Sequence, residues 1–162
     1  MPSGFFLAAR CLAAGAALSL LAGCPGLDDV FEQSDIKNVT IDPDPVATPT
    51  AGAAADFNVT VSFDSERDND RLVVLIRSPH DDNRFKEIGA PVPCPNRREG
   101  GGCGNGTLAI PCTVELSQNF TGERSVGCGT SRADMAVGDY TLRVEIVNES
   151  VDDTKDVTVR IR

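Results

Sequence analysis

Alternation of apolar and polar residues constrains the fold of this chain more than any other feature of its sequence. Residues 57–63 read Phe-Asn-Val-Thr-Val-Ser-Phe, and this period of two is typical of a β-strand with one buried face. The same alternation recurs over residues 140–146 and 157–161. Between residues 36 and 162 no segment of useful length repeats its apolar residues every 3.6 positions, as an amphipathic helix would. The sequence therefore predicts an all-β protein.

Shorter segments fill in the expected strands. Residues 36–41 predict a strand that stops at Pro43 and Pro45, because proline cannot donate to a β-ladder. The continuous apolar run 72–76 predicts a central strand that is buried on both faces, and residues 84–88 predict a short one. With 162 residues, the chain is long enough for one ordinary domain. Seven to eight short strands with frequent turns predict an antiparallel β-sandwich.

The first 23 residues have the composition of a targeting segment. They contain one cation, Arg10, and no acidic residue, and an apolar run of small residues and leucines follows the arginine. This run is shorter than the roughly 20 apolar residues that span a bilayer, so it predicts a cleaved signal peptide. We therefore expect three parts, with a signal peptide at residues 1–23, a tether at 24–35 and a sandwich domain at 36–162.

The segment ends in Leu21-Ala22-Gly23-Cys24, which resembles the lipobox of bacterial lipoproteins. The resemblance implies that Cys24 becomes the first residue of the mature chain and carries acyl chains such as palmitate, which anchor the domain to a membrane of the cell envelope. Pro25 stands where the family's usual inner-membrane retention signal has aspartate, which favours the outer membrane. The alternative is ordinary cleavage that leaves Cys24 as a free thiol.

The remaining cysteines predict an oxidising compartment. Without Cys11 and Cys24, four cysteines are left, and an even number in an exported domain implies two disulfides with three possible pairings. Residues 112–116 and 124–128 can form a hairpin in which Cys112 faces Cys128, at a distance that a disulfide can bridge. Cys94 and Cys103 would then close the polar loop between them. Zinc binding is disfavoured, because the chain has no CxxC pair and one histidine.

The charge of the chain limits its partners. The formal net charge is −9, and removal of residues 1–23 takes away Arg10 alone and makes it −10. A nucleic-acid partner is disfavoured, because phosphate binding needs clustered cations. Membrane attachment would depend on acyl chains rather than on a basic patch, because anionic lipids repel an acidic chain.

Two stretches resemble bacterial immunoglobulin-like domains. Residues 36–45, Ile-Lys-Asn-Val-Thr-Ile-Asp-Pro-Asp-Pro, together with residues 57–63, look like their opening strands. Residues 138–144, Gly-Asp-Tyr-Thr-Leu-Arg-Val, resemble their penultimate strand, in which the tyrosine often forms a corner hydrogen bond. This resemblance implies an immunoglobulin-like sandwich with a non-catalytic structural or interaction role, whose partner is an unknown envelope or extracellular protein.

A weaker likeness is to the ML lipid-recognition domain, which also begins with an Ile-x-x-Val strand and has a disulfide loop in mid-chain. It implies an alternative function, a carrier that holds a lipid or another apolar ligand between its two sheets. The final strand, residues 156–161, lacks the cysteine that this family usually carries there.

Catalytic and cofactor sites have little support in the sequence. No nucleophile–base or acid–base constellation can be assembled around the single His80, and the Ser-x-x-Lys spacing of Ser34 and Lys37 lacks its partner motifs. We therefore expect no enzyme activity and no cofactor. One acidic loop has oxygen ligands that suit calcium, although a solvated loop explains the same residues. These calcium candidates are Asp64, Glu66, Asp68 and Asp70.

One pattern has no explanation in the sequence. Composition alone predicts about one Asn-x-Ser/Thr tripeptide in a chain of this kind, yet the sequence contains five. They begin at Asn38, Asn58, Asn105, Asn119 and Asn148.

Overall fold

The computed structural model describes residues 34–49, 53–65, 67, 70–93 and 104–162, all of which belong to one compact unit, Glu32–Arg162. The strands of this described part are β1 (Asp35–Asp42), β2 (Ala55–Ser65), β3 (Arg71–Arg77), β4 (Phe85–Glu87), β5 (Val92–Pro93), β6 (Gly104–Leu116), β7 (Arg124–Gly127), β8 (Ala133–Met135), β9 (Gly138–Val147) and β10 (Val151–Ile161). The predicted all-β class is confirmed. None of the described residues forms a helix long and apolar enough to span a membrane.

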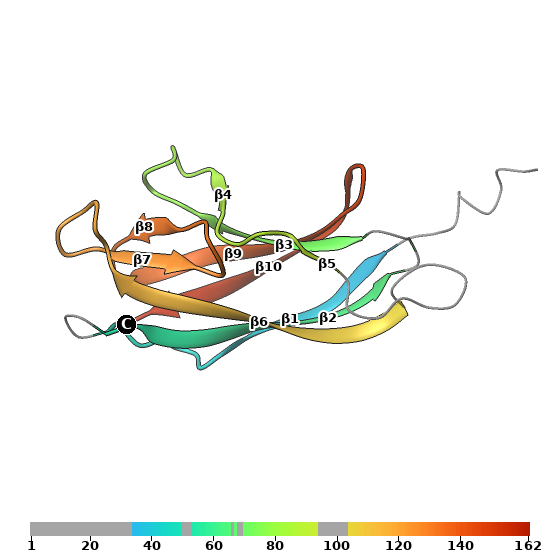
Figure 1. Ribbon diagram of the computed structural model, residues 1–162, viewed down its shortest axis with the longest axis horizontal. Helices are drawn as coiled ribbons and strands as arrows, with labels where there is room; N and C mark the ends of the chain where they lie inside the picture. The colour runs from blue at the N-terminus through green and yellow to red at the C-terminus, as the bar shows by residue number, and fades with distance from the viewer. Residues whose placement is uncertain (1–33, 50–52, 66, 68–69, 94–103) are drawn as a thin grey trace, which may run out of the picture. The chain divides into compact units, whose positions relative to one another are not determined.

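The strands form two antiparallel sheets that face each other (Figure 1). Sheet A has the order β1-β2-β6-β7-β8, and sheet B has the order β10-β9-β3-β4, with β5 also paired to β3. In the immunoglobulin arrangement, strands A, B and E share one sheet with D, and strands C, F and G form the other. Here β1, β2 and β6 take the places of A, B and E, and β3, β9 and β10 those of C, F and G. The place of D is taken by β7, which follows β6 along the chain.

The predicted number of seven to eight strands is too low, because the described residues form ten. The two strands that the sequence does not indicate, β5 and β8, have two and three residues. A strand this short shows no period, and it forms only because a longer neighbour supplies the hydrogen-bonding partner.

Inward-facing residues of both sheets form one core. Sheet A contributes Val59, Val61 and Val114, and sheet B contributes Leu142 and Val144, all of them fully buried. These residues occupy alternate positions of their strands, as the period of two requires. In β3 even Val73, which faces away from this core, is only 8% exposed. The prediction that residues 72–76 form a central strand is therefore confirmed.

Strand β6 begins earlier than the sequence suggests. The glycine-rich segment 89–106 is expected to be a loop, whereas β6 already begins at Gly104 and runs for 13 residues. Gly104 has a φ of 65°, which glycine adopts without strain. A Cβ at position 106 would come within 3.0 Å of the Phe63 ring on the neighbouring strand. These two glycines therefore belong to the β2–β6 pairing rather than to a loop.

The expected tyrosine corner is present. The hydroxyl of Tyr140, near the start of β9, donates a hydrogen bond to the carbonyl oxygen of Ala136 at 2.8 Å. This contact fixes the turn between β8 and β9, at the position where immunoglobulin-like domains have the same bond.

Candidate interaction surface

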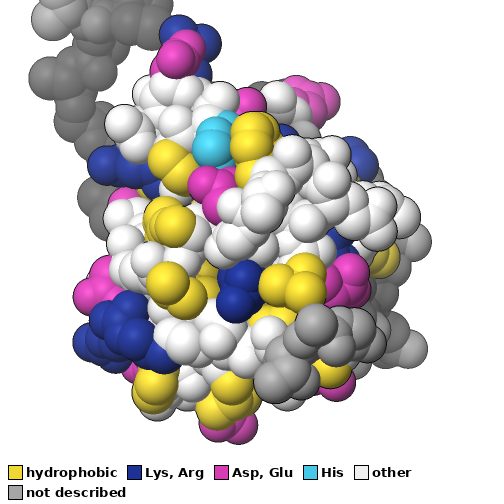
Figure 2. Space-filling view, turned by 90° about the vertical axis from the view of Figure 1, so that its left-hand side faces the viewer, with side chains coloured by type: hydrophobic (Ala, Val, Ile, Leu, Met, Phe, Trp, Pro, Cys, Tyr) yellow, Lys and Arg dark blue, Asp and Glu magenta, His cyan; other side chains and the backbone are white. Residues whose placement is uncertain are grey.

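Three connections meet at one end of the sandwich. We call this surface the loop end. It consists of residues 78–84 between β3 and β4, residue 116 at the end of β6 with residues 117–123 between β6 and β7, and residues 136–137 between β8 and β9. Three exposed large hydrophobic side chains lie here, namely Leu116 (37% exposed), Phe120 (42%) and Val137 (57%). Figure 2 shows this end of the molecule, with the histidine between hydrophobic side chains.

The loop between β6 and β7 is held by a short polar network. The Ser117 hydroxyl accepts the backbone N–H groups of Asn119 and Phe120 and donates to Asp134 Oδ1 at 2.8 Å. The Asn119 amide donates to the second oxygen of Asp134 at 2.7 Å. A serine that bonds to the backbone two and three residues on is typical of a tight turn. Asp134 in β8 thus sets the position of Phe120.

His80 joins this loop to the β3–β4 connection. Its ring stacks on Phe120 with a centroid distance of 4.1 Å and an interplanar angle of 5°. Its Nε2 lies 2.7 Å from the Glu123 carboxylate. The two loops are therefore in direct contact, and the exposed Phe120 ring is supported by a neighbouring ring.

Two ionisable groups of this region have shifted pKa values. Partial burial acts to raise the pKa of Asp134, but hydrogen bonds from Asn119, Ser117 and Ser125 outweigh it and hold that pKa below its ordinary value. Burial raises the pKa of Tyr140, and the charge of Glu123 adds to this shift. The Asp134 carboxylate is therefore stabilised in the charged form, and the Tyr140 hydroxyl in the neutral form.

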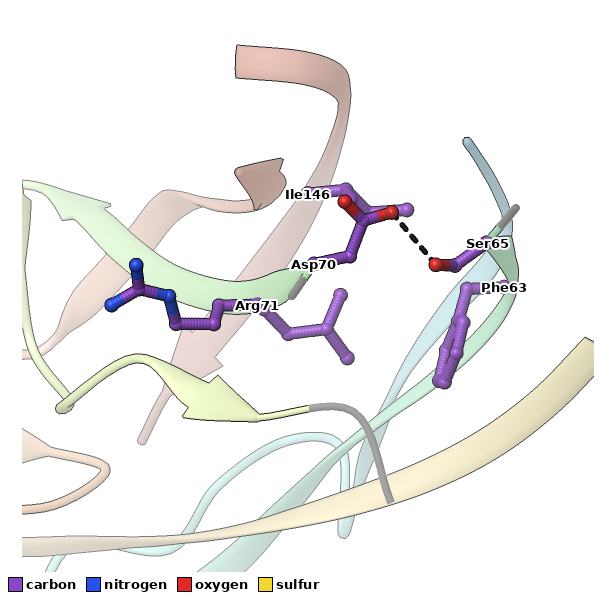
Figure 3. Close-up of a pocket in the computed structure, with 6 residues that line it drawn as sticks. Phe63, Ser65, Asp70, Arg71 and Ile146 are labelled. Carbon is purple, nitrogen blue, oxygen red and sulfur yellow. Dashed lines mark hydrogen bonds between the residues drawn. The ribbon is translucent and has the colours of Figure 1, made fainter. Parts of the chain in front are cut away.

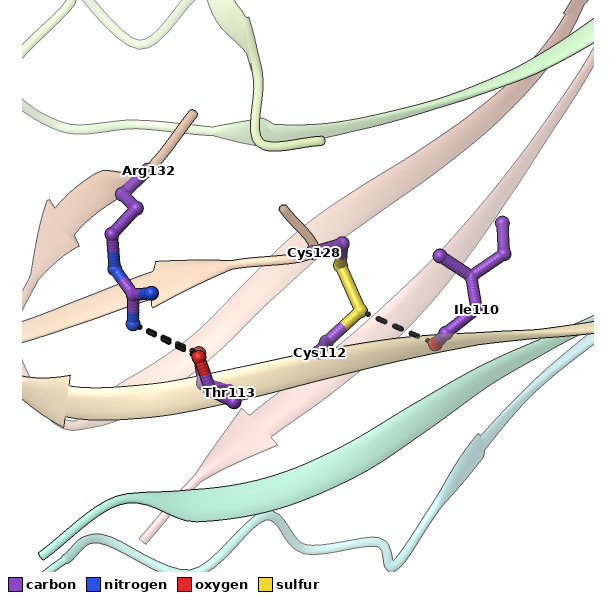
Figure 4. Close-up of a disulfide and its surroundings, with 5 residues drawn as sticks. All are labelled: Ile110, Cys112, Thr113, Cys128 and Arg132. Atoms are coloured by element: carbon purple, nitrogen blue, oxygen red, sulfur yellow. Dashed lines mark hydrogen bonds between the residues drawn. A yellow bond between two sulfur atoms is a disulfide. The ribbon is translucent and has the colours of Figure 1, made fainter. Parts of the chain in front are cut away.

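The structure contains the predicted disulfide between Cys112 and Cys128 (Figure 4). The hairpin has the predicted register, with Val114 opposite Val126, and the two cysteines follow at its inner end with Cα atoms 3.9 Å apart. On the outer face Arg132 bridges the two strands, donating to the Thr113 hydroxyl at 3.1 Å and to the Ser125 carbonyl oxygen at 3.0 Å. The disulfide anchors the strands that carry the Phe120 loop.

Two of the four calcium candidates, Asp64 and Asp70, lie among the described residues. Asp64 lies on the outer face of β2, beside Asn105. Asp70 is 2% exposed and accepts a hydrogen bond from the Ser34 hydroxyl at 2.5 Å. It accepts a second from the Ser65 hydroxyl at 2.7 Å (Figure 3). Glu66 and Asp68 lie outside the described residues. Because Asp70 already accepts these bonds, its role in the described part is structural.

A small cavity adjoins Asp70. It is lined by Phe63, Leu72 and Ile146 among others and has a volume of about 10 Å³. Figure 3 shows the Arg71 side chain extending away from the carboxylate. Pockets for small-molecule ligands measure roughly 300–1,000 Å³, so this cavity has room for about one water molecule and none for a lipid chain.

The two residues of the Ser-x-x-Lys spacing, Ser34 and Lys37, make separate structural contacts. Ser34 is buried against Asp70, whereas Lys37 is exposed and pairs with Asp35. The two side chains therefore have different partners, as a chance match of spacing predicts. Among the described residues, no three His, Cys, Asp or Glu side chains are grouped so that they could hold a metal ion.

Besides Glu66 and Asp68, three predicted site residues lie outside the described residues. They are the lipidation candidate Cys24 and the two cysteines of the second predicted disulfide, Cys94 and Cys103. The loop end, in contrast, was not indicated by the sequence. The local sequence shows only an aromatic residue, Phe120, within the polar turn Ser-Gln-Asn-Phe-Thr-Gly, and a single exposed hydrophobic side chain does not by itself indicate a binding surface.

No protein-family model matches the chain, and no curated protein matches it. Among solved structures, the chain is similar to a CARDB domain from Pyrococcus furiosus that was solved in complex with di-metal ions. The two share 15% identity over 81% of this chain and 96% of that domain, with a TM-score of 0.35. It is also similar to part of a GH3 beta-glucosidase from Bifidobacterium adolescentis, at 15% identity over 80% of this chain and 17% of the enzyme, with a TM-score of 0.36.

Proposed function

We propose that this protein is an exported lipoprotein of the bacterial cell envelope with a non-catalytic structural or protein-interaction role. Acyl chains on Cys24 anchor it to the membrane, the outer membrane being favoured, and the loop end contacts a protein partner. The residues before Cys24, Leu-Ser-Leu-Leu-Ala-Gly, support lipidation because they end in a sequence that resembles a lipobox. Two or more acyl chains on one residue would anchor a soluble domain stably.

The Cys112–Cys128 disulfide is the main observation that supports the proposed export of this protein. Structural disulfides form and persist in oxidising compartments and are rare in the cytosol of most organisms. This bond lies inside the sandwich, where Cys112 is 2% exposed, so it is part of the core rather than a reactive surface thiol pair.

The composition of the loop end supports a protein partner. Protein interfaces are enriched in aromatic side chains, which act as anchors when a polar rim surrounds them. Here Phe120 is exposed but held in place by His80, and Glu123 and Asp81 lie in the same two loops. Strand β1 begins at the opposite end of the sandwich (Figure 1).

Metabolic labelling with a clickable palmitate analogue tests the anchor. The full chain, expressed in a Gram-negative host, is expected to incorporate the label and to fractionate with membranes. Cys24→Ser should abolish both, whereas the matched variant Cys11→Ser, in the predicted signal peptide, should leave both unchanged. Equal labelling of the parent and C24S would contradict lipidation at Cys24.

Site-specific photo-cross-linking tests the loop end. A photoreactive amino acid replaces Phe120 in one variant and Val151, which is 51% exposed at the other end of the sandwich, in a second. We expect one discrete protein adduct from position 120 in intact cells, and none from position 151. Adducts of equal yield from both positions would remove the support for the loop end as the contact surface.

A further inference from the structure

The outer face of β1, β2 and β6 differs from the rest of the surface in charge. Lys, Arg, Asp and Glu make up 24% of the chain, yet the two central rows of outward side chains on this face contain none of them. The rows on either side contain carboxylates, because Asp42 lies opposite Asn58, and Asp35 and Asp64 lie in the row of Asn105. We call the uncharged side chains of these four rows the neutral face. Its outward side chains, which alternate with buried ones in each strand, are Asn38, Thr40, Asn58, Thr60, Ser62, Asn105, Thr107, Ala109 and Pro111.

The sheet register aligns these side chains in rows across the three strands. One row contains Asn38, Ser62 and Thr107, and the next contains Thr40, Thr60 and Ala109. Neighbouring strands lie about 4.8 Å apart, and alternate residues of a strand about 6.8 Å apart. The result is a grid of amide and hydroxyl groups.

This grid accounts for three of the five Asn-x-Ser/Thr tripeptides. In a strand, residues i and i+2 point to the same face, so each tripeptide places an amide and a hydroxyl next to each other. The tripeptides at Asn38, Asn58 and Asn105 belong to adjacent strands of sheet A, and all three asparagines are exposed. Most of the excess of Asn-x-Ser/Thr tripeptides in the sequence therefore comes from the asparagine and threonine residues of this one surface.

Most hydrogen-bonding groups of the neutral face are uncommitted. Ser62 and Thr107 bond to each other at 3.2 Å, and Asn105 donates to Asp64. Asn38, Thr40, Asn58 and Thr60 have no side-chain hydrogen bond within the described part. Each carries donors and acceptors together, which is also true of a sugar hydroxyl.

We propose that the neutral face binds an uncharged polysaccharide of the cell envelope. The amide and hydroxyl groups of the grid match a ligand whose hydroxyls both donate and accept. The lack of charged side chains in its two central rows matches an uncharged ligand. The face has no aromatic side chain, so each sugar unit contributes a few hydrogen bonds and a polymer gains affinity by occupying the grid repeatedly. This inference rests on the proposed export, which brings the protein to such polymers.

A protein partner fits this face less well. The centres of protein interfaces are depleted in charge but enriched in apolar and aromatic groups, and the neutral face contributes only Ala109 and Pro111 of that kind. A charged polysaccharide would require cations, which the centre of the face lacks. The loop end therefore remains the surface for a protein, and the neutral face the surface for a neutral glycan.

Affinity electrophoresis tests this proposal. The full mature chain, in non-ionic detergent, is run in native gels with and without hydroxyethylcellulose, a neutral β-glucan, and with alginate, an acidic polysaccharide. We expect retardation by hydroxyethylcellulose and not by alginate. The retardation should not change between 50 and 500 mM NaCl, conditions that would screen an ionic contact.

Substitutions on β2 locate the binding surface. In Asn58→Ala/Thr60→Val, two groups of the grid lose their hydrogen bonds while valine maintains strand propensity, and the dissociation constant should rise about tenfold or more. The matched control is Thr158→Val, an exposed threonine of β10 on the outer face of sheet B, which should bind as the parent does.

Two results would overturn the proposal. One is an unchanged mobility of the parent in hydroxyethylcellulose, and the other is full retardation of the folded N58A/T60V variant, with circular dichroism confirming its fold. Failure of palmitate labelling with intact retardation would instead contradict the lipid anchor and leave the glycan surface standing.

Discussion

Single polar residues tie together segments that are far apart in the sequence. Asp70 accepts hydrogen bonds from Ser34, Ser65 and Asn148, which lie 36, 5 and 78 positions away. Asp134 likewise holds the turn that carries Phe120. A buried polar group without a partner costs more free energy than the bond itself contributes. The loss of either carboxylate therefore affects several groups at once.

Asp70→Ala is expected to lower the free energy of unfolding by about 2–3 kcal/mol. It leaves the buried Ser34 hydroxyl without its partner and the Ser65 hydroxyl with only a long bond, of 3.5 Å, to the Arg67 carbonyl oxygen. The measurement is urea unfolding followed by circular dichroism. Asp81→Ala, which removes an exposed carboxylate near Lys86, serves as the matched control and should change stability by less than about 0.5 kcal/mol. Equal effects of the two substitutions would contradict the structural role of Asp70.

Asp134→Ala should lower stability in a way that depends on pH. The pKa of Asp134 is lowered in the folded protein, so its contribution is present above the unfolded value of about 3.9 and is lost as pH falls through the folded pKa. We expect a difference from the parent of about 1–2 kcal/mol that is constant from pH 8 to 5 and shrinks below pH 4. Urea unfolding at each pH measures it, and a difference that grows below pH 4 would refute the assignment.

Among the elements, the β6–β7 hairpin depends most on local sequence. Cys112, Val114 and Leu116 alternate on β6, and their partners follow on β7 after a single turn. Contacts this close in sequence need little loop closure, so the register can be derived without the rest of the fold. Strand β6 also pairs with β2 over eleven residue pairs, and this long-range pairing extends β6 back to Gly104.

Cys112→Ser/Cys128→Ser is expected to cost about 3 kcal/mol of stability, the value for a loop of about 15 residues closed by a disulfide. The separation here is 16 residues. Thermal unfolding monitored by circular dichroism, with and without reductant, measures the loss. Cys94→Ser/Cys103→Ser is the parallel variant for the second predicted disulfide, and peptide mapping under non-reducing conditions identifies each bond. A peptide that links Cys112 to Cys94 or Cys103 would disprove the pairing.

For the whole molecule, the two sheets share one continuous core. Side chains of β2 and β6 face those of β3 and β9, and fully buried residues occur in both sheets. Backbone hydrogen bonds also link the two sheets at the sides of the sandwich. The Cys128 N–H donates to the Ile88 carbonyl oxygen at 2.6 Å, and the Val46 N–H donates to the Arg160 carbonyl oxygen at 2.7 Å. Stability should therefore depend on interior packing.

Val144→Ala and Val137→Ala remove the same two methyl groups from β9 and from the turn just before it. Val144 is 0% exposed and Val137 is 57% exposed, so the first should cost about 2–3 kcal/mol through lost burial and a cavity, and the second less than about 0.5 kcal/mol. Chemical denaturation at neutral pH measures both. Similar losses would mean that residue 144 does not lie in a close-packed core.

The candidate surfaces were predictable only in part. The alternation that predicts strand β2 also implies that Asn58, Thr60 and Ser62 share an exposed face, but which strands lie beside it depends on the sheet order. At the loop end, His80 and Phe120 are 40 positions apart, and neither is part of a motif. Such contacts leave no local signal, because the two loops meet only after the sheets have packed.

The amino-acid sequence by itself determined the all-β class, the long alternating strands and the β6–β7 register with its disulfide, while the tyrosine corner was implied by the resemblance to immunoglobulin-like domains. All of these depend on side-chain period or on contacts close along the chain. The tertiary structure decided the short strands β5 and β8, the early start of β6, the burial of Asp70 and the assembly of the loop end. Each of these depends on a partner that is distant in sequence, and such partners come together only when the two sheets pack.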